Sequence, residues 1–321
     1  MKVSVLFVIY EGKKYIKPVF DSVFAQTHKD LEVIAVINKS TDGGKEEIAQ
    51  NYPQVKIIEE GRNMGFAEGN NVAIHASTGE FVQLVNQDVI LEPDYIEKCL
   101  QVFEQDYLIA GVTGKILKYD FNRNQKTNII DTTGQVANVS GRVRDRGQNE
   151  VDTNQYNKQE EVFGISGACV MYKKQALEKV MYCEHGKCEY YDEDFFMYWE
   201  DADLSWRINN AGLKNIYAPQ AVAYHGRTAG QSEGGYWKLI KFIKHHKKLD
   251  KQVLRWNYKN HILMYIKNAK FIFHPQFLIR EFFMLGYIVL FETSTLKVIP
   301  DLLRTMPKTL RKRRVFKALM Q

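Results

Sequence analysis

Short apolar runs rich in β-branched residues alternate with amphipathic stretches along the first third of the sequence. Residues 3–9 read VSVLFVI, and the runs at 31–37, 55–59 and 81–85 have the same character. A run that is apolar at nearly every position is typical of a strand covered on both faces. Apolar residues at helical spacing fill the stretches between these runs: 15–26, 45–51 and 67–77. Strand and helix in alternation predict βαβ units, and therefore an α/β fold with a mostly parallel sheet flanked by helices.

The sequence beyond the fourth run divides into three parts. Residues 111–164 are irregular, with short alternating strands and polar loops, as in insertions that shape a substrate cleft. Regular structure returns afterwards, with expected elements at 165–172 (strand), 174–180 (helix) and 201–211 (helix). After Gly235 the chain becomes basic and aromatic. We therefore expect two domains, an α/β domain over 1–235 and a basic amphipathic helical region over 236–321.

Charge is distributed unevenly between these two regions. Residues 236–321 carry 19 Lys/Arg against 4 Asp/Glu, a balance of +15, whereas residues 1–235 carry 25 against 34, a balance of −9. A strongly basic segment indicates an anionic partner. We favour lipid headgroups over nucleic acid and expect no nucleic-acid partner. A solvated basic helical surface is the other reading.

Two apolar runs lie inside the basic region, at 271–279 and 282–291, and polar residues interrupt them. Neither reaches the roughly 18–20 apolar residues that span a bilayer. An interfacial helix lying in the headgroup layer fits better, with the final basic residues adding attraction to anionic lipid. Helices packed on the body would show the same pattern, so both arrangements stay open.

The cysteines and the N-terminus indicate the cytoplasm. Four cysteines are too few and too scattered for a disulfide framework, and Cys183 and Cys188 lack the second ligand pair of a zinc site. The N-terminal apolar run is too short for a signal peptide. We therefore expect reduced cysteines and a cytoplasmic protein on the inner face of the cell membrane.

Polar residues follow each expected strand, where open α/β sheets bind their ligands. They include Tyr10 and Glu11 after the first strand, Asn38 to Asp42 after the second, and Asn86 to Asp88 after the fourth. Such loops can hold a nucleobase, a ribose and a diphosphate, although each alone is also an ordinary turn. A carboxylate such as Asp88 at a strand end suits a divalent cation that bridges phosphates.

The most distinctive local segment is 195–207, in which Glu200, Asp201 and Asp203 open a helix beside five aromatic residues. A helix N-terminus stabilises carboxylates, which suits a general base, and the aromatic residues could stack on a sugar ring. Acidic residues in the first turn are also common N-terminal caps. His225 follows a short apolar strand and becomes a metal ligand only if a second ligand lies nearby.

Together, these segments resemble the family 2 glycosyltransferases of the GT-A fold, particularly the rhamnosyltransferase-like members. The resemblance rests on five motifs in the correct order across about residues 1–230. They are the opening strand with the Asn38–Gly43 turn, the segment Arg62–Asn71, the residues Asn86-Gln87-Asp88, the loop Gly164–Ala168, and Glu200-Asp201-x-Asp203-Leu-x-x-Arg207 with the late His225. Asn86 stands where the family carries the first aspartate of its metal-binding motif.

The resemblance implies a role for each matched residue. Asp201 would be the catalytic base, supported by Glu200 and Asp203, while Asp88 and His225 would hold Mg²⁺ or Mn²⁺. Gly167, Trp199 and Arg207 would lie on the acceptor side. The residues that would bind the nucleotide sugar are Tyr10, Glu11, Asn38, Ser40, Asp42, Asn63, Gly65, Asn70, Asn71, Asn86 and Gln87.

The implied reaction is an inverting transfer of a sugar, with rhamnose a candidate, from a nucleotide diphosphate to a glycan or polyprenyl-linked acceptor during polysaccharide assembly. A nucleotidyltransferase would need a Gly-rich phosphate loop with a Lys or Arg directly after the first strand, and Tyr10-Glu11-Gly12 does not supply one. A catalytically silent carbohydrate-binding protein on the same fold is the alternative.

Overall fold

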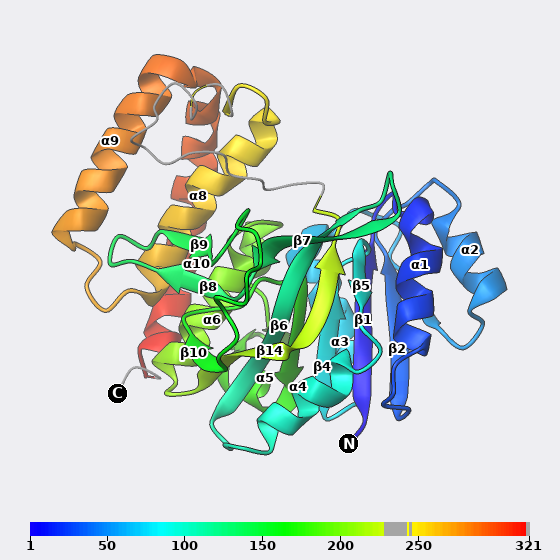
Figure 1. The fold of residues 1–321 in the computed structure, drawn as a ribbon. Helices are drawn as coiled ribbons and strands as arrows, with labels where there is room; N and C mark the ends of the chain where they lie inside the picture. The colour runs from blue at the N-terminus through cyan, green and yellow to red at the C-terminus, as the bar shows by residue number, and fades with distance from the viewer. Residues whose placement is uncertain (228–242, 244–245, 319–321) are drawn as a thin grey trace.

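The computed structural model describes residues 1–227, 243 and 246–318. Its centre is a ten-stranded sheet in the order β10-β14-β6-β11-β4-β1-β2-β3, with β5 paired to β14 and β7 paired to β6 (Figure 1). Four neighbouring strands form a parallel half: β1 (Val3–Ile9), β2 (Leu31–Ile37), β3 (Lys56–Glu59) and β4 (Phe81–Val85). The apolar runs of the sequence are these four strands.

Helices cover both faces of the sheet. Along β1 the side chains of Val3, Val5 and Phe7 pack with α1 (Lys13–Phe24), while Leu6 joins the opposite cluster with α3 (Gly65–Ala76). Such alternation is the period-2 geometry of a strand buried on two sides. The first layer also contains α2 (Gly44–Asn51) and α4 (Tyr95–Phe103), and the second contains α5 (Lys174–Val180) and α6 (Glu200–Asn210). The α/β architecture predicted from the sequence is confirmed.

The other half of the sheet is mixed. β11 (Cys169–Lys173) runs antiparallel to both β4 and β6 (Ile109–Asp120), whereas β14 (Lys214–His225) runs parallel to β6. The strand expected at 165–172 starts only at Cys169. Ile165 lies outside it because its N–H donates to Ser205 Oγ of α6 and not to a neighbouring strand. The remaining strands of this half are β5 (Val89–Leu91), β7 (Gln125–Thr132) and β10 (Glu160–Val162), beside a separate pair, β8 (Gln135–Ala137) and β9 (Val143–Asp145).

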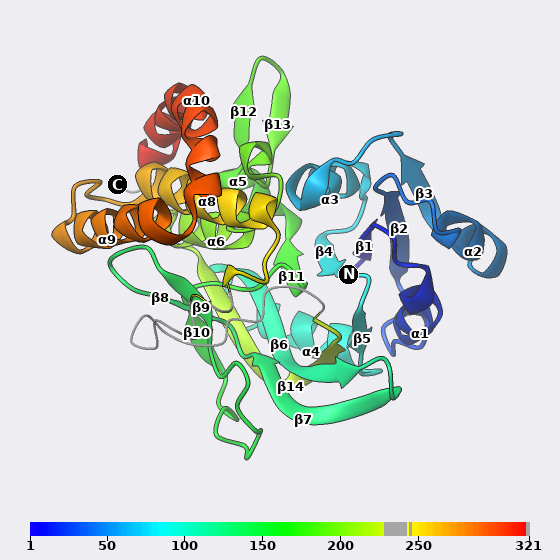
Figure 2. The ribbon, with the colours of Figure 1, turned by 90° about the horizontal axis from the view of Figure 1, so that it is seen from above.

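Over residues 246–318 the structure describes α8 (Lys251–Asn268), α9 (Pro275–Phe291) and, after the short helix η3 (Thr293–Val298), α10 (Ile299–Lys317). Figures 1 and 2 show them grouped at the end of the sheet remote from α1 and α2. α8 packs against α6 and α10. The domain boundary expected between 235 and 236 lies outside the described residues.

No single helix in the described ranges combines the length and hydropathy that crossing a membrane requires, although α9 and the η3–α10 stretch, bent by 116°, meet both together.

The cysteine prediction is wrong for one pair. Cys183 and Cys188 form a disulfide across the hairpin of β12 (Tyr182–Glu184) and β13 (Lys187–Glu189). The hairpin register places these two residues directly opposite each other. Cys99 and Cys169 are free and buried.

Candidate active site

The loops after β1 and β4 are joined by one side chain, the amide of Gln87. Its Oε1 accepts from the N–H of Tyr10 at 2.8 Å, and its Nε2 donates to the carbonyl of Tyr10 at 2.9 Å. A Cβ on Gly12 would lie 2.4 Å from this Oε1, so the glycine is needed for the approach. The expected nucleotide-binding side chain of Gln87 thus fixes the backbone of Tyr10, while the Tyr10 side chain is half exposed.

The loops after β1 and β2 are joined by hydrogen bonds as well. Glu11 donates its N–H to Ser40 Oγ at 3.0 Å and accepts at Oε1 from the N–H of Thr41 at 2.9 Å. Asp42 accepts from the N–H groups of Lys13 at 2.7 Å and Gly44 at 3.0 Å, which ties together the starts of α1 and α2. A hollow of about 470 Å³ lies beside these loops. Its lining consists of Lys13, Ser40, Thr41, Gly43, Glu46, Glu47 and Gln50.

Three asparagines expected to bind the nucleotide are buried and serve the protein backbone. Asn38 accepts from the N–H of Met64 at 2.6 Å and donates to the carbonyl of Gly65 at 3.1 Å. Asn70 donates to the carbonyl of Phe66, and Asn71 bonds the backbone of Tyr190 and Tyr191. In the structure these side chains hold the loops around the site through backbone groups, and a direct contact with the nucleotide stays a prediction. Asn63 likewise accepts from the N–H of Gly65.

Asp88 and His225 meet at the edge where β4 and β14 end. Asp88 Oδ1 lies 3.3 Å from His225 Nε2, and the carbonyl of Asp88 accepts from the N–H of Gly226 at 2.9 Å. The other ring nitrogen, Nδ1, lies 2.8 Å from Asp131 Oδ2. Burial lowers the pKa of His225, but its hydrogen bonds to Asp131 and Asp88 raise it overall, to about 9. The 3.3 Å contact shows that the two residues predicted as metal ligands are adjacent.

The pair fits a divalent cation. Two ligand atoms at about 2.1 Å from one ion lie roughly 3 Å apart when they are at right angles, close to the observed 3.3 Å. A carboxylate on Nδ1 is the usual support of a histidine that coordinates a metal through Nε2. Within the described ranges, no three His, Cys, Asp or Glu side chains form a complete metal site. Mg²⁺ is commonly bound by one or two carboxylates together with substrate phosphates, and Asp88 offers one such carboxylate.

Two further residues extend this arrangement. Arg227 donates to Asp131 at 2.8 Å and to Asp145 of β9 at 2.7 Å. Burial raises the pKa of Asp145 despite the opposing charge of Arg227. Asp131 and Asp145 lie in the irregular middle segment and Arg227 follows β14, so none of the three belongs to the motifs that indicated the site. The available signals were the position of Asp131 near the end of an apolar run and that of Arg227 two residues after His225.

Asp201 faces the same edge from α6. Its Oδ2 accepts from Gln135 Nε2 at 3.0 Å and from the N–H of Gly167 at 3.2 Å. Gly167 precedes Ala168, whose carbonyl accepts from the N–H of Asn86 at 2.8 Å. Asn86 directly follows β4, so these hydrogen bonds link Asp201 to the end of that strand. Burial and then the charge of Asp145 raise the pKa of Asp201, which makes it a stronger proton acceptor than an ordinary aspartate. The link from Asp201 through Gly167 and Ala168 to Asn86 agrees with the expected grouping of Asp88, His225 and Asp201, and a shared pocket stays a prediction.

Asp203 and Arg207, expected in catalytic and acceptor-side roles, are buried and paired with groups of the same protein. Asp203 is 0% exposed and pairs with Arg207 Nε at 3.0 Å and with Lys267 of α8 at 2.8 Å. Arg207 is 1% exposed, and its remaining N–H groups donate to the carbonyls of Val180 and Tyr190. These contacts fix α6 against its neighbours, and the roles expected for the two residues stay predictions.

Glu200 and Trp199 lie between the base and the C-terminal helices. Glu200 is buried, and burial followed by the charges of Asp201 and Asp203 raises its pKa well above the usual value. Trp199 donates its indole N–H to Asn257 Oδ1 of α8 at 3.1 Å. The partly buried indole therefore lies against α8, and a direct contact with an acceptor stays a prediction.

The comparison with known proteins agrees with this geometry. The sequence profile described as Glycosyl transferase family 2 matches residues 4–181, more than half of the 321-residue chain. The chain belongs to glycosyl transferase family 2. It is a glycosyltransferase with a GT-A fold and with rhamnosyltransferase-like relatives.

Three similar proteins illustrate the range of this family. The N-acetylglucosaminyl-diphospho-decaprenol L-rhamnosyltransferase of Mycobacterium tuberculosis is 26% identical over 242 residues, covering 69% of this chain and 75% of that protein. The solved structure of GalNAc-T7 with UDP, GalNAc and Mn²⁺ has a TM-score of 0.59 at 14% identity and covers 82% of this chain and 47% of its own. The mannosyltransferase PcManGT from Pyrobaculum calidifontis, with GDP-Man and Mn²⁺, has a TM-score of 0.52 at 17% identity, covering 99% and 83%. The two structures show the shared fold.

Gly65, in the family motif before α3, allows a test of the loop geometry. Its φ is +70°, and a Cβ there would lie 2.4 Å from the carbonyl oxygen of Phe196. We expect Gly65→Ala to lower the free energy of unfolding by about 2–4 kcal/mol, because positive φ and backbone overlap both cost stability. Gly212 has the same φ with nothing within 4 Å, so Gly212→Ala should cost only about 1–2 kcal/mol. Urea unfolding measures both, and equal losses would contradict the contact with Phe196.

Proposed function

We propose that this chain is an inverting glycosyltransferase that moves a sugar from a nucleotide diphosphate to a lipid-linked or glycan acceptor in cell-surface polysaccharide assembly. Two sets of contacts support the proposal: Asp88 meets His225 where β4 and β14 end, and Asp201 accepts from Gly167, beside the loop that bonds the end of β4. Asp201 supplies a base, and the pair supplies a cation site for a diphosphate, so that one edge of the sheet holds both halves of a transfer reaction.

In the proposed reaction, an acceptor hydroxyl attacks the anomeric carbon of the donor from the face opposite the diphosphate. Asp201 takes the hydroxyl proton as the new carbon–oxygen bond forms and the bond to the diphosphate oxygen breaks. Gln135 and the N–H of Gly167 keep the Asp201 carboxylate oriented. Asp88 and His225 would hold Mg²⁺ or Mn²⁺, which neutralises negative charge on the leaving diphosphate.

The acceptor and the metal are inferred by analogy. The Mycobacterium tuberculosis relative is named for transfer of rhamnose to a decaprenyl-diphosphate-linked N-acetylglucosamine, which supports a polyprenyl-linked acceptor here. The two solved neighbours contain Mn²⁺ together with UDP or GDP-Man, which supports a divalent cation with a nucleotide-diphosphate sugar.

The outer surface of α9 supports a peripheral position on the inner face of the membrane. Its two charged residues, Arg280 and Glu281, turn inward to His261, whereas apolar side chains face outward. The exposed apolar residues on this helix are Leu278, Ile279, Phe282, Phe283, Leu285, Val289, Leu290 and Phe291. Exposed Lys270 and Lys297 flank the helix in sequence, and the nearby Glu292 is paired with His246. An apolar face with cations at its ends suits an anionic lipid surface.

Sedimentation with phosphatidylglycerol-rich vesicles at physiological salt tests this position. We expect the full chain to bind and the double variant Phe282→Ser/Phe283→Ser to bind at least about tenfold more weakly, since burying one Phe side chain is worth about 1.5–3 kcal/mol. Tyr107→Ser is the control, because Tyr107 is 82% exposed on the body. Equal binding by all three proteins would remove α9 from this role.

The activity is tested by thermal shift with dTDP-, UDP- and GDP-sugars, with and without Mn²⁺, followed by release of the nucleoside diphosphate in the presence of a polyprenyl-linked sugar. dTDP-rhamnose is the first donor to test. Binding together with metal-dependent release supports the proposal. Binding of a donor without transfer to any acceptor would favour the silent carbohydrate-binding alternative.

A further inference from the structure

The segment that leads into the catalytic helix has an unusual backbone. Phe196, Tyr198 and Trp199 have φ values of 63°, 70° and 74°, in the left-handed region that non-glycine residues rarely occupy. Such conformations persist only when the surrounding structure enforces them, and they gather at functional sites. Asp201 lies two residues after Trp199, so the contacts that enforce this backbone also influence where the base lies.

Asn260 of α8 provides the main polar support on one side of this segment. Its side-chain Nδ2 lies within donating distance of three carbonyl oxygens: 2.9 Å from Phe195, 3.0 Å from Met197 and 2.9 Å from Tyr198. Asn260 is 0% exposed, so water does not compete for these contacts. On the other side, the N–H groups at the start of α3 donate to the carbonyl of Phe196.

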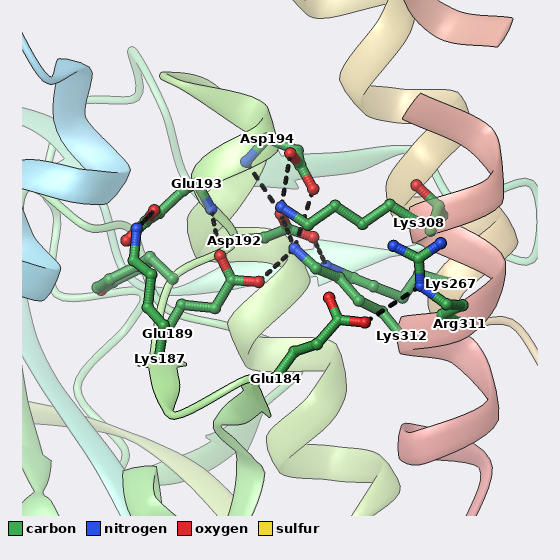
Figure 3. Close-up of polar contacts among 12 residues, drawn as sticks. Glu184, Lys187, Glu189, Asp192, Glu193, Asp194, Lys267, Lys308, Arg311 and Lys312 are labelled. Carbon is green, nitrogen blue, oxygen red and sulfur yellow. Dashed lines mark hydrogen bonds and ion pairs between the residues drawn. The ribbon is translucent and has the colours of Figure 1, made fainter. Parts of the chain in front are cut away.

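Lysines of the C-terminal helices hold the acidic residues that begin the segment (Figure 3). Lys312 of α10 lies 2.5 Å from Asp192 and 3.0 Å from Asp194, and it also contacts Glu189. Lys267 of α8 pairs with Asp192 and, at 2.8 Å, with Asp203. Both lysine side chains are 1% exposed. Burial raises the pKa of Asp192, but Lys267 and Lys312 bring it well below the usual value, so the carboxylate stays charged.

These contacts come from two helices and converge on a single loop. Contacts that only attached these helices to the α/β domain could form on any part of its surface. Here the polar groups act on residues 189–203, which contain the base, while the loops after β1, β2 and β4 are held by their own hydrogen bonds.

We propose that α8 and α10 form part of the active site, with Asn260, Lys267 and Lys312 acting as positioning residues that keep segment 192–201 and its base Asp201 in reactive geometry. This inference rests on the proposed function. It adds that the C-terminal helices serve the chemical step of the reaction as well as any surface to which the protein binds.

The test compares Asn260→Ala and Lys312→Met in the full chain. We expect each to lower kcat about 10- to 100-fold, because small displacements of a reacting group have effects of that size. The KM for the donor should stay within about threefold, since the donor loops are held separately. Gln252→Ala and Arg311→Met are the controls. Gln252 lies at the exposed start of α8. Arg311 is on the same helix as Lys312 and pairs with Glu184 at the surface.

Hydrogen–deuterium exchange separates positioning from general loss of stability. In both variants we expect faster exchange in the peptide that covers 192–201, with unchanged exchange in β1 and β4. If the kcat of both variants stays within twofold of the wild type, or if exchange rises equally throughout the sheet, the proposal is wrong. If the wild type transfers no sugar, the proposed function fails, whereas the exchange measurement still decides whether these residues hold the segment.

Discussion

Asp201→Asn lowers kcat by about 10²–10⁴-fold, the usual contribution of a positioned general base. The amide keeps the size of the side chain and can still accept from the N–H of Gly167, but it cannot take a proton from an acceptor hydroxyl. Donor binding should persist, because the loops after β1, β2 and β4 are unchanged. Steady-state kinetics of nucleoside diphosphate release measures the loss, with thermal shift by the donor as the folding control.

The pH dependence of the wild type gives a second measure of the same group. Burial and the charge of Asp145 raise the pKa of Asp201, and the base works only when deprotonated. Activity should therefore fall as the pH decreases, starting at a higher pH than an ordinary aspartate would give. Loss of this acidic limb in the residual activity of Asp201→Asn would support the assignment. Wild-type activity in the variant would exclude Asp201 as the base.

His225→Ala raises the Mn²⁺ concentration required for half-maximal activity by at least about 10- to 100-fold. Loss of a group that only hydrogen-bonds to a metal ligand typically lowers metal affinity about 10- to 100-fold. His225 is expected to be a ligand itself, so its loss should have at least that effect. Asp88 then remains as the sole predicted protein ligand of the cation. Titration of activity with Mn²⁺ at saturating donor measures the change.

Asp131→Asn is the matched comparison, because Asp131 contacts the Nδ1 atom of the same imidazole and not the expected cation. We expect a smaller rise in the Mn²⁺ requirement than for His225→Ala. An unchanged requirement in His225→Ala would make His225 a structural histidine, fixed between the two carboxylates of Asp88 and Asp131.

The sequence predicted the fold well where the pattern of side chains is determined by burial on both faces. The runs at 3–9, 31–37 and 81–85 are strands with those bounds, since such strands need apolar residues at nearly every position. The adjacency of Asp88 and His225 was also predictable, because ligands of α/β sheets gather at the carboxyl ends of strands, and both residues lie at such ends.

The parts that depend on contacts between distant segments were not predictable from local pattern. Asn71 belongs to a family motif, but only the structure shows that Tyr190 and Tyr191 use its amide. Asp131 and Asp145 lie on strands of the irregular middle segment, and the local pattern does not show that they contact His225 and Arg227.

The basic C-terminal region illustrates a different limit. Its charge indicated an anionic partner, and we favoured lipid. Several of its cations instead bind carboxylates of the same chain: Lys312 and Lys267 are buried against Asp192, and Lys308 pairs with Asp194. Charge counting identifies the sign of a partner but does not show whether that partner is another molecule or the acidic half of the same protein.

The contacts of Asn260 have a consequence for engineering. Exchanging C-terminal regions between relatives to redirect where such enzymes act would also exchange the groups that support residues 195–198. A hybrid with a foreign α8 would need a matching side chain at this position, and its own lysines would have to match the recipient's acidic loop. Residues 189–203 and 251–317 should therefore be exchanged together, so that the supporting groups and the loop that they support come from the same protein.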